Sequence, residues 1–111
     1  MEHLLNNSIE RIRNAAHTRN LLHKADVSVC LKCEEFIQVI FIHNGEIQLK
    51  TQSNESEDLL IEGNKDSMKI LLNGENFLTS MKKREDIVVS GKLKDILLME
   101  SIWYLTQKNK N

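Results

Sequence analysis

Apolar residues in the first part of the chain recur with the period of an α-helix. Over residues 4–22 they are spaced four and three residues apart, as in Leu5, Ile9 and Ile12, with polar residues between them. At residues 27–33 the period changes to two, and apolar and polar residues alternate. A period of two is typical of a strand with one buried face. The pattern therefore predicts an amphipathic helix followed by a half-buried strand.

The next two segments predict further strands that pair in sequence. Residues 36–42 are rich in β-branched and aromatic side chains, which favours a central strand. Asn44-Gly45 follows, a pair whose residues both tolerate the positive φ angles of a tight hairpin turn. Ile47 and Leu49 then alternate with polar residues. We therefore expect three consecutive antiparallel strands, a meander.

The second half of the chain predicts a fourth strand, two short helices and a fifth strand. A polar, acidic loop leads to the fourth strand over residues 59–62. Asn64 suits the N-cap of the first helix, which carries an apolar stripe and ends at Asn73-Gly74. Asn76 suits the cap of the second helix, and residues 87–89 form the fifth strand.

The last predicted helix, residues 93–105, differs from the others in being apolar on most sides. Nine of its thirteen residues are apolar, and they do not lie on one stripe. Such a helix must be covered on several sides, by the body of the protein, a partner or a ligand. The predicted order α-β-β-β-β-α-α-β-α, with strands in a run and helices to cover them, favours an α+β fold. With 111 residues, we expect a single domain over residues 1–111.

Composition and charge exclude several classes of protein. There are 15 Lys and Arg residues against 16 Asp and Glu, so the net charge of −1 gives no reason to expect a nucleic-acid partner. The longest apolar runs, residues 39–42 and 96–99, are too short to predict a transmembrane segment. The first residues carry no apolar signal stretch. We therefore expect a cytoplasmic location and reduced cysteine thiols.

Candidate catalytic and metal-binding residues are few. Cys30 and Cys33 have the C-x-x-C spacing, but residues three apart on a strand face opposite sides of the sheet, and no second pair follows. The four histidines form no metal-binding or catalytic pattern. We therefore predict no catalytic residue, no metal and no cofactor, and we do not expect an enzyme.

Three motifs in the second half follow one another as strand, helix and strand. They are Leu60-Ile61-Glu62-Gly63-Asn64-Lys65-Asp66, Leu71-Leu72-Asn73-Gly74 and Ile87-Val88-Val89-Ser90-Gly91-Lys92-Leu93. With the Asn44-Gly45 hairpin and the order of elements, these motifs resemble the sterol carrier protein type 2 family of lipid-binding domains. One departure is Glu85-Asp86, which stands where the family usually has Gly-Lys before the fifth strand and adds negative charge there.

The resemblance implies a particular form of the α+β fold and a function. The fold would be a five-stranded, mostly antiparallel sheet with helices packed on one face, enclosing an apolar tunnel. The function would be non-catalytic binding and carriage of a hydrophobic lipid: a fatty acyl, isoprenoid or sterol-like molecule. The partner expected from the resemblance is therefore a hydrophobic small molecule.

A lipid carrier needs an apolar wall that its own side chains do not completely fill. An empty cavity costs about 24 cal/mol per Å³, and a bound chain offsets this by about 0.8 kcal/mol per buried methylene. The predicted lining residues, expected to face inward, are Ile9, Ile12, Phe41, Leu49, Phe77, Met81, Ile87, Val89, Leu98, Ile102 and Trp103. The same residues also fit a solid core, and periodicity does not distinguish the two.

Two other functions fit the sequence. The chain fits a protein-interaction or accessory module with a solid core, whose C-terminal helix docks on an enzyme or on a second copy in a homodimer. Trp103 and Tyr104 would be the anchors, because aromatic residues dominate binding energy at interfaces. The weaker alternative is an enzyme that uses Cys30 or Cys33.

Overall fold

The first predicted helix is divided in the computed structural model, which describes residues 1–51 and 57–108. The segments are α1 (Glu2–Asn14), the 3₁₀ turn η1 (Ala16–Thr18) and α2 (Arg19–Lys24). The prediction of one continuous helix is therefore wrong. Ala15 is extended, with φ −88° and ψ 104°, so α1 ends there. The Thr18 hydroxyl donates to the carbonyls of Ile12 and Ala15, which also accept the backbone N–H groups of Ala15 and Thr18, so the backbone acceptors at the break are satisfied.

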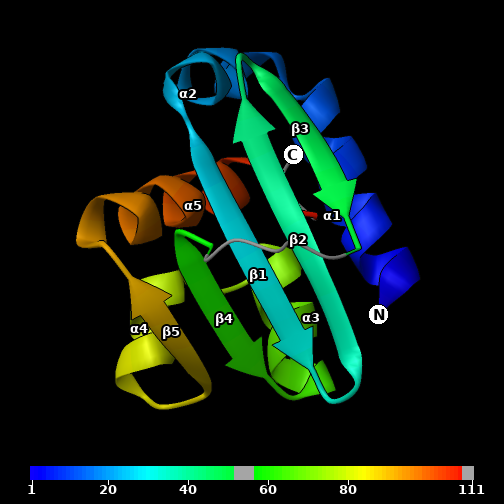
Figure 1. Cartoon of the computed structure of the whole chain (residues 1–111), viewed down its shortest axis with the longest axis vertical. Coiled ribbons are helices and arrows are strands. Elements are labelled where there is room, and N and C mark those ends of the chain that lie inside the picture. The colour runs from blue at the N-terminus through cyan, green and yellow to red at the C-terminus, as the bar shows by residue number, and fades with distance from the viewer. Residues whose placement is uncertain (52–56, 109–111) are drawn as a thin grey trace.

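The described residues form one sheet of five strands in the order β3-β2-β1-β4-β5 (Figure 1). The strands are β1 (Val27–Cys33), β2 (Phe36–His43), β3 (Glu46–Lys50), β4 (Leu59–Gly63) and β5 (Ile87–Gly91). The first three pair antiparallel, which confirms the predicted meander. β4 pairs parallel to β1 and antiparallel to β5, so the sheet is mostly antiparallel with one parallel pair.

Positive φ angles at the β2–β3 turn explain its sequence. Asn44 has φ 54° and Gly45 has φ 80°, the left-handed region that a two-residue hairpin of this kind requires. A side chain at Gly45 would also collide with the His23 ring, since a Cβ there would lie 2.5 Å from His23 Cε1. The turn therefore fixes the register of β2 against β3 and sets α2 against the same corner.

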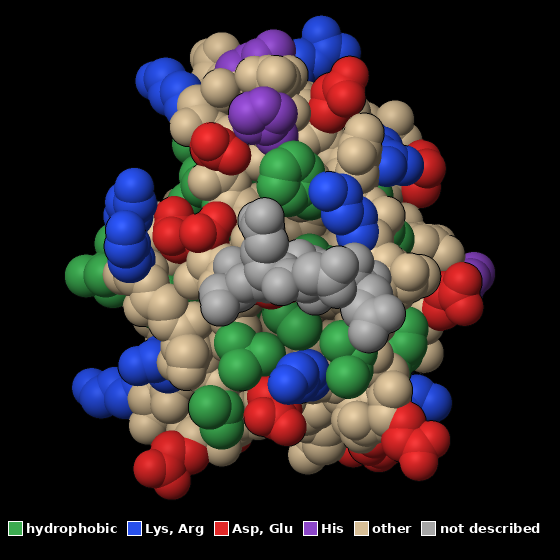
Figure 2. Space-filling view, viewed as in Figure 1, with side chains coloured by type: hydrophobic (Ala, Val, Ile, Leu, Met, Phe, Trp, Pro, Cys, Tyr) green, Lys and Arg blue, Asp and Glu red, His purple; other side chains and the backbone are tan. Residues whose placement is uncertain are grey.

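The helices lie together on one face of the sheet, as Figure 1 shows. Besides α1, they are α3 (Lys65–Leu72), α4 (Leu78–Lys83) and α5 (Leu93–Leu105). Alternate residues of β1, such as Val29 and Leu31, are fully buried against them. This layer between sheet and helices is the hydrophobic core, and the α+β architecture with helices on one face is confirmed. Figure 2 shows the opposite face of the sheet, where hydrophobic side chains lie among charged ones. Ile37, paired with Lys32, and Val88, paired with Glu62, are exposed on this face.

Asn64 caps α3 as the sequence predicts. Its Oδ1 accepts a hydrogen bond of 2.8 Å from the backbone N–H of Ser67. The second cap differs by one position, because α4 begins at Leu78 and Asn76 Oδ1 accepts instead from the N–H of Phe77. Each asparagine side chain thus accepts a hydrogen bond from a backbone N–H at the start of a short helix.

Replacing Asn64 with alanine is expected to lower the free energy of unfolding by about 1 kcal/mol. The substitution leaves the Ser67 N–H without its acceptor, and loss of an N-cap typically costs this amount. Urea denaturation followed by circular dichroism measures the change. Asn64→Ser, which keeps a capping oxygen, is the matched control and should retain most of the stability. An alanine variant as stable as the parent would show that the cap contributes nothing.

Candidate functional site

Most of the predicted lining residues meet in the core layer. Seven of the eleven are buried in one cluster: Ile9, Ile12, Met81, Ile87, Val89, Ile102 and Trp103. Leu49 and Leu98 are partly buried against the same cluster. They come from α1, β3, α4, β5 and α5, so segments far apart in the sequence contribute to one apolar layer. This layer is the candidate site for an apolar ligand.

The structure places the two phenylalanines of that set elsewhere. Phe41 is paired opposite Ser28, on the sheet face turned away from the helices, and Lys50 Nζ lies 4.4 Å from its ring centroid. Phe77 is 45% exposed, with its ring 5.1 Å from that of Tyr104. The prediction that both face inward is therefore wrong. The register of β2 turns Phe41 away from the helices, and the start of α4 at Leu78 leaves Phe77 outside the helix.

Two polar atoms in the interior lack a hydrogen-bond partner among the described residues. They are the indole Nε1 of Trp103 and the hydroxyl Oγ of Ser8, in side chains that are only 2% and 1% exposed. Leaving a buried donor unpaired typically costs about 1–3 kcal/mol, so such atoms are uncommon in folded proteins. Ser8 lies one helical turn before Arg11 on α1, and Trp103 lies one turn before Thr106, whose carbonyl accepts a hydrogen bond from Arg11. Neither atom could be predicted from the sequence, because the burial of each depends on tertiary packing.

Arg11 joins three elements at one end of this core. Its Nε donates to the Thr106 carbonyl at 3.0 Å, and its Nη2 donates to the Leu72 carbonyl at 2.8 Å. These carbonyls lie at the C-terminal ends of α5 and α3, where helix dipoles concentrate partial negative charge. Burial lowers the pKa of the guanidinium below its ordinary value, but the two carbonyls offset part of the cost of burying the cation.

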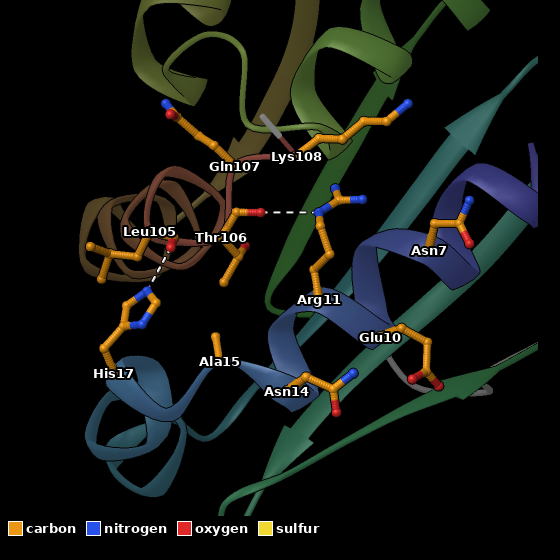
Figure 3. Close-up of a pocket in the computed structure, with 10 residues that line it drawn as sticks. All are labelled: Asn7, Glu10, Arg11, Asn14, Ala15, His17, Leu105, Thr106, Gln107 and Lys108. Carbon is orange, nitrogen blue, oxygen red and sulfur yellow. Dashed lines mark hydrogen bonds between the residues drawn. The ribbon is translucent and has the colours of Figure 1, made fainter. Parts of the chain in front are cut away.

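A groove of about 750 Å³ opens beside Arg11, between α1 and the residues that end α5 (Figure 3). The side of His17 facing α5 carries Nε2, which lies 2.7 Å from the Leu105 carbonyl. The groove is lined by Asn7, Glu10, Arg11, Asn14, Ala15, His17, Leu105, Thr106, Gln107 and Lys108. The hydrogen bonds of Arg11 and His17 tie α1 and η1 to the end of α5, so both side chains act here as structural donors. Neither residue stands in a local sequence pattern that predicts this role, because the partner carbonyls lie 88 and 95 residues away in the chain.

The two cysteines do not form a joint site. Cys33 faces the core and Cys30 the other side of the sheet, as a strand spacing of three requires. Burial raises the pKa of both thiols above the ordinary value, which disfavours the reactive thiolate. Among the described residues, no group of three or more His, Cys, Asp or Glu side chains could hold a metal ion.

Tyr104 and Trp103, the two predicted docking anchors, differ in exposure. Trp103 is 2% exposed and belongs to the core, whereas Tyr104 is 45% exposed at the surface of α5. Trp103 is therefore not available to a partner at the surface.

In the parts of the chain that the structure describes, no helix is long and apolar enough to cross a membrane.

Known structures share this arrangement of sheet and helices. A structure described as the UbiJ-SCP2 ubiquinone synthesis protein matches with a TM-score of 0.76 at 7% identity, covering 96% of this chain and 94% of that one. Sterol carrier protein domain 2 of Helicoverpa armigera gives a TM-score of 0.70 at 16% identity, over 89% and 84% of the two chains. The chain has the sterol carrier protein 2 fold.

A crystal structure of sterol carrier protein 2 shares this fold over 96% of this chain and 95% of its own, with a TM-score of 0.66 and 11% identity. Sequence comparison gives no such match: no protein-family model and no curated protein sequence matches the chain. The similarity to sterol carrier protein 2 is therefore seen in the arrangement of helices and strands and not in the amino-acid sequence. The resemblance drawn from the motifs of the second half is confirmed at the level of the fold.

Proposed function

We propose that the chain binds a hydrophobic lipid non-covalently, between its sheet and its helices, and does no covalent chemistry on it. The observation that carries the proposal is the fold shared over nearly the whole chain with proteins named sterol carriers and with a ubiquinone synthesis protein. Lipid binding in the apolar layer is the function that this architecture supports best. The bound molecule would be carried or presented rather than converted.

The composition of the core supports this proposal. Three methionines, Met68, Met81 and Met99, are fully buried among the β-branched residues of the sheet. Unbranched thioether side chains adapt to different shapes, which lets a core open around a ligand with less strain than a wall of β-branched residues. Each methylene of a bound chain that leaves water contributes about 0.8 kcal/mol toward that opening.

The polar atoms of the core narrow the ligand class within the proposal. A lipid that carries a carbonyl, hydroxyl or carboxyl oxygen would provide an acceptor for Trp103 Nε1 and a partner for the Ser8 hydroxyl. A plain hydrocarbon would leave both atoms unpaired. We therefore propose a fatty acyl, isoprenoid or sterol-like molecule with an oxygen-bearing end, lined by the inward-facing members of the predicted set.

Native mass spectrometry of the purified protein, with solvent extraction and lipid identification, tests the proposal. We expect a discrete adduct whose mass matches an extracted lipid, and a raised melting temperature with members of the same class. Stabilisation by a ligand at 100 times its Kd is about 2.7 kcal/mol, which a thermal scan resolves. A ligand-free mass together with no stabilisation by fatty acids, isoprenoid alcohols or sterols would contradict the proposal.

A further inference from the structure

The outward side of α5 carries large apolar side chains that the core does not cover. Leu93 is 65% exposed and Leu97 is 44% exposed, one turn apart on the same side of the helix. Tyr104 lies two turns beyond Leu97 on that side, and its ring contacts that of Phe77. These four residues, Phe77, Leu93, Leu97 and Tyr104, form one exposed strip, which we call the α5 strip.

Contacts between α4 and α5 show which charges flank the strip. The backbone N–H and the hydroxyl of Thr79 both donate to Glu100 Oε1, at 2.9 and 2.6 Å. These bonds and the Phe77–Tyr104 contact pair the start of α4 with the end of α5, so the two helices run antiparallel. Lys83, four residues after Thr79, is exposed and therefore lies one turn further toward the start of α5. Lys92 and Lys94 are exposed at that same end.

The acidic side chains of α5 do not offset these lysines. Asp95 is buried, and Glu100 is partly buried and accepts both bonds from Thr79. The exposed charged side chains of α4 and α5 are therefore lysines, while Glu75 and Glu85 are exposed just outside the two helices. The partly buried Glu100 lies between Leu97 and Tyr104 on the strip's side of α5, where Thr79 binds its Oε1. Arg84, just past α4, is paired with Asp86 at 2.8 Å and adds no net charge.

We propose that the α5 strip docks this protein on an anionic membrane surface. Exposed leucine side chains on one side of a helix can enter the boundary between headgroups and acyl chains, and tyrosine is favoured at that depth. The lysines beside the strip extend their apolar stems along it and place their ammonium groups among anionic headgroups. The strip lies on α5, whose opposite side forms part of the core, so docking brings the proposed lipid site next to a bilayer.

Flotation with lipid vesicles tests the docking surface without any ligand in the core. The full chain should bind vesicles of phosphatidylcholine mixed with phosphatidylglycerol, bind pure phosphatidylcholine far less, and be released by salt. The double variant Leu93→Ser/Leu97→Ser should bind at least about tenfold more weakly, because most of the apolar contact is lost. Removing Lys83 or Lys94 as alanine should weaken binding about fivefold each.

Matched controls separate this surface from general stickiness. Ile37→Ser removes an apolar residue that is 50% exposed on the sheet face away from the helices, and Lys69→Ala removes an exposed lysine of α3. Both should bind as the parent does. Equal loss in the controls, unchanged binding in the leucine variant, or a strip-dependent dimer or protein complex in place of vesicle binding would overturn the proposal. Because vesicle binding and lipid extraction are measured separately, this proposal and lipid carriage can fail independently.

Discussion

Replacing Trp103 with alanine is expected to lower the free energy of unfolding by about 3–5 kcal/mol, a large fraction of the total for a small domain. Trp103 is the largest of the fully buried side chains, and it packs in the cluster that joins α5 to the sheet. Truncation removes its transfer free energy and leaves a cavity that the neighbouring residues fill only in part. Urea denaturation monitored by circular dichroism measures the change. A loss below about 1 kcal/mol would contradict the burial described for this residue.

Trp103→Phe separates the ring of this residue from its unpaired N–H. Phenylalanine keeps most of the apolar volume and removes Nε1, so the ligand-free protein should lose far less stability than the alanine variant does. If the N–H donates to a ligand oxygen, the same substitution should weaken binding of an oxygen-bearing lipid about tenfold, the effect of a hydrogen bond of about 1.4 kcal/mol. Equal affinity in both proteins, measured by titration calorimetry, would show that the N–H takes no part in binding.

Replacing Arg11 with methionine is expected to lower the free energy of unfolding by about 2–3 kcal/mol. The variant keeps an apolar stem of similar reach but leaves the Leu72 and Thr106 carbonyls without their donors. Hydrogen bonds from a charged group are worth about 1.5–3 kcal/mol, and here two of them hold α1 to the ends of α3 and α5. Thermal and urea unfolding give the stability, and amide hydrogen exchange shows whether the end of α5 opens first.

Arg13→Met is the matched control for Arg11. Arg13 lies on the same helix and also donates to a carbonyl, that of Ile47 at 2.8 Å, while its ion pair with Glu10 is long at 3.7 Å and exposed. Arg13 makes one bond to a carbonyl where Arg11 makes two, and its side chain is 47% exposed, so we expect a smaller loss of about 1 kcal/mol. Similar losses in the two variants would contradict a special role of Arg11 in joining the helices.

Several features of the fold could be predicted because they are encoded in short stretches of sequence. The period of two in β1, the Asn44-Gly45 turn and the Asn64 cap each depend on neighbours within a few residues. The all-round apolar character of α5 likewise indicated that the helix would be covered on more than one side. In the structure one side of α5 is in the core, while Leu93 and Leu97 lie on another side.

Other features depend on contacts between distant segments and escaped prediction. Nothing at Ala15 disfavours a helix, and the break there depends on how η1 packs beneath the end of α5, where His17 bonds to Leu105. The outward placement of Phe41 follows from strand register, and the exposure of Phe77 follows from where α4 begins. Arg11 has no local signature, since its partners are 61 and 95 residues away in the chain.

The sequence by itself determined the type and order of most elements, since helix and strand periods and turn residues act locally. It also indicated the residues of the second half that resemble the sterol carrier protein type 2 family. Only the tertiary structure decided that β4 pairs parallel to β1 and that the polar atoms of Ser8 and Trp103 are buried without a partner. It also decided that Arg11 binds the carbonyls at the ends of α3 and α5. These depend on which distant surfaces meet, and burial, unlike periodicity, is a property of the assembled layers.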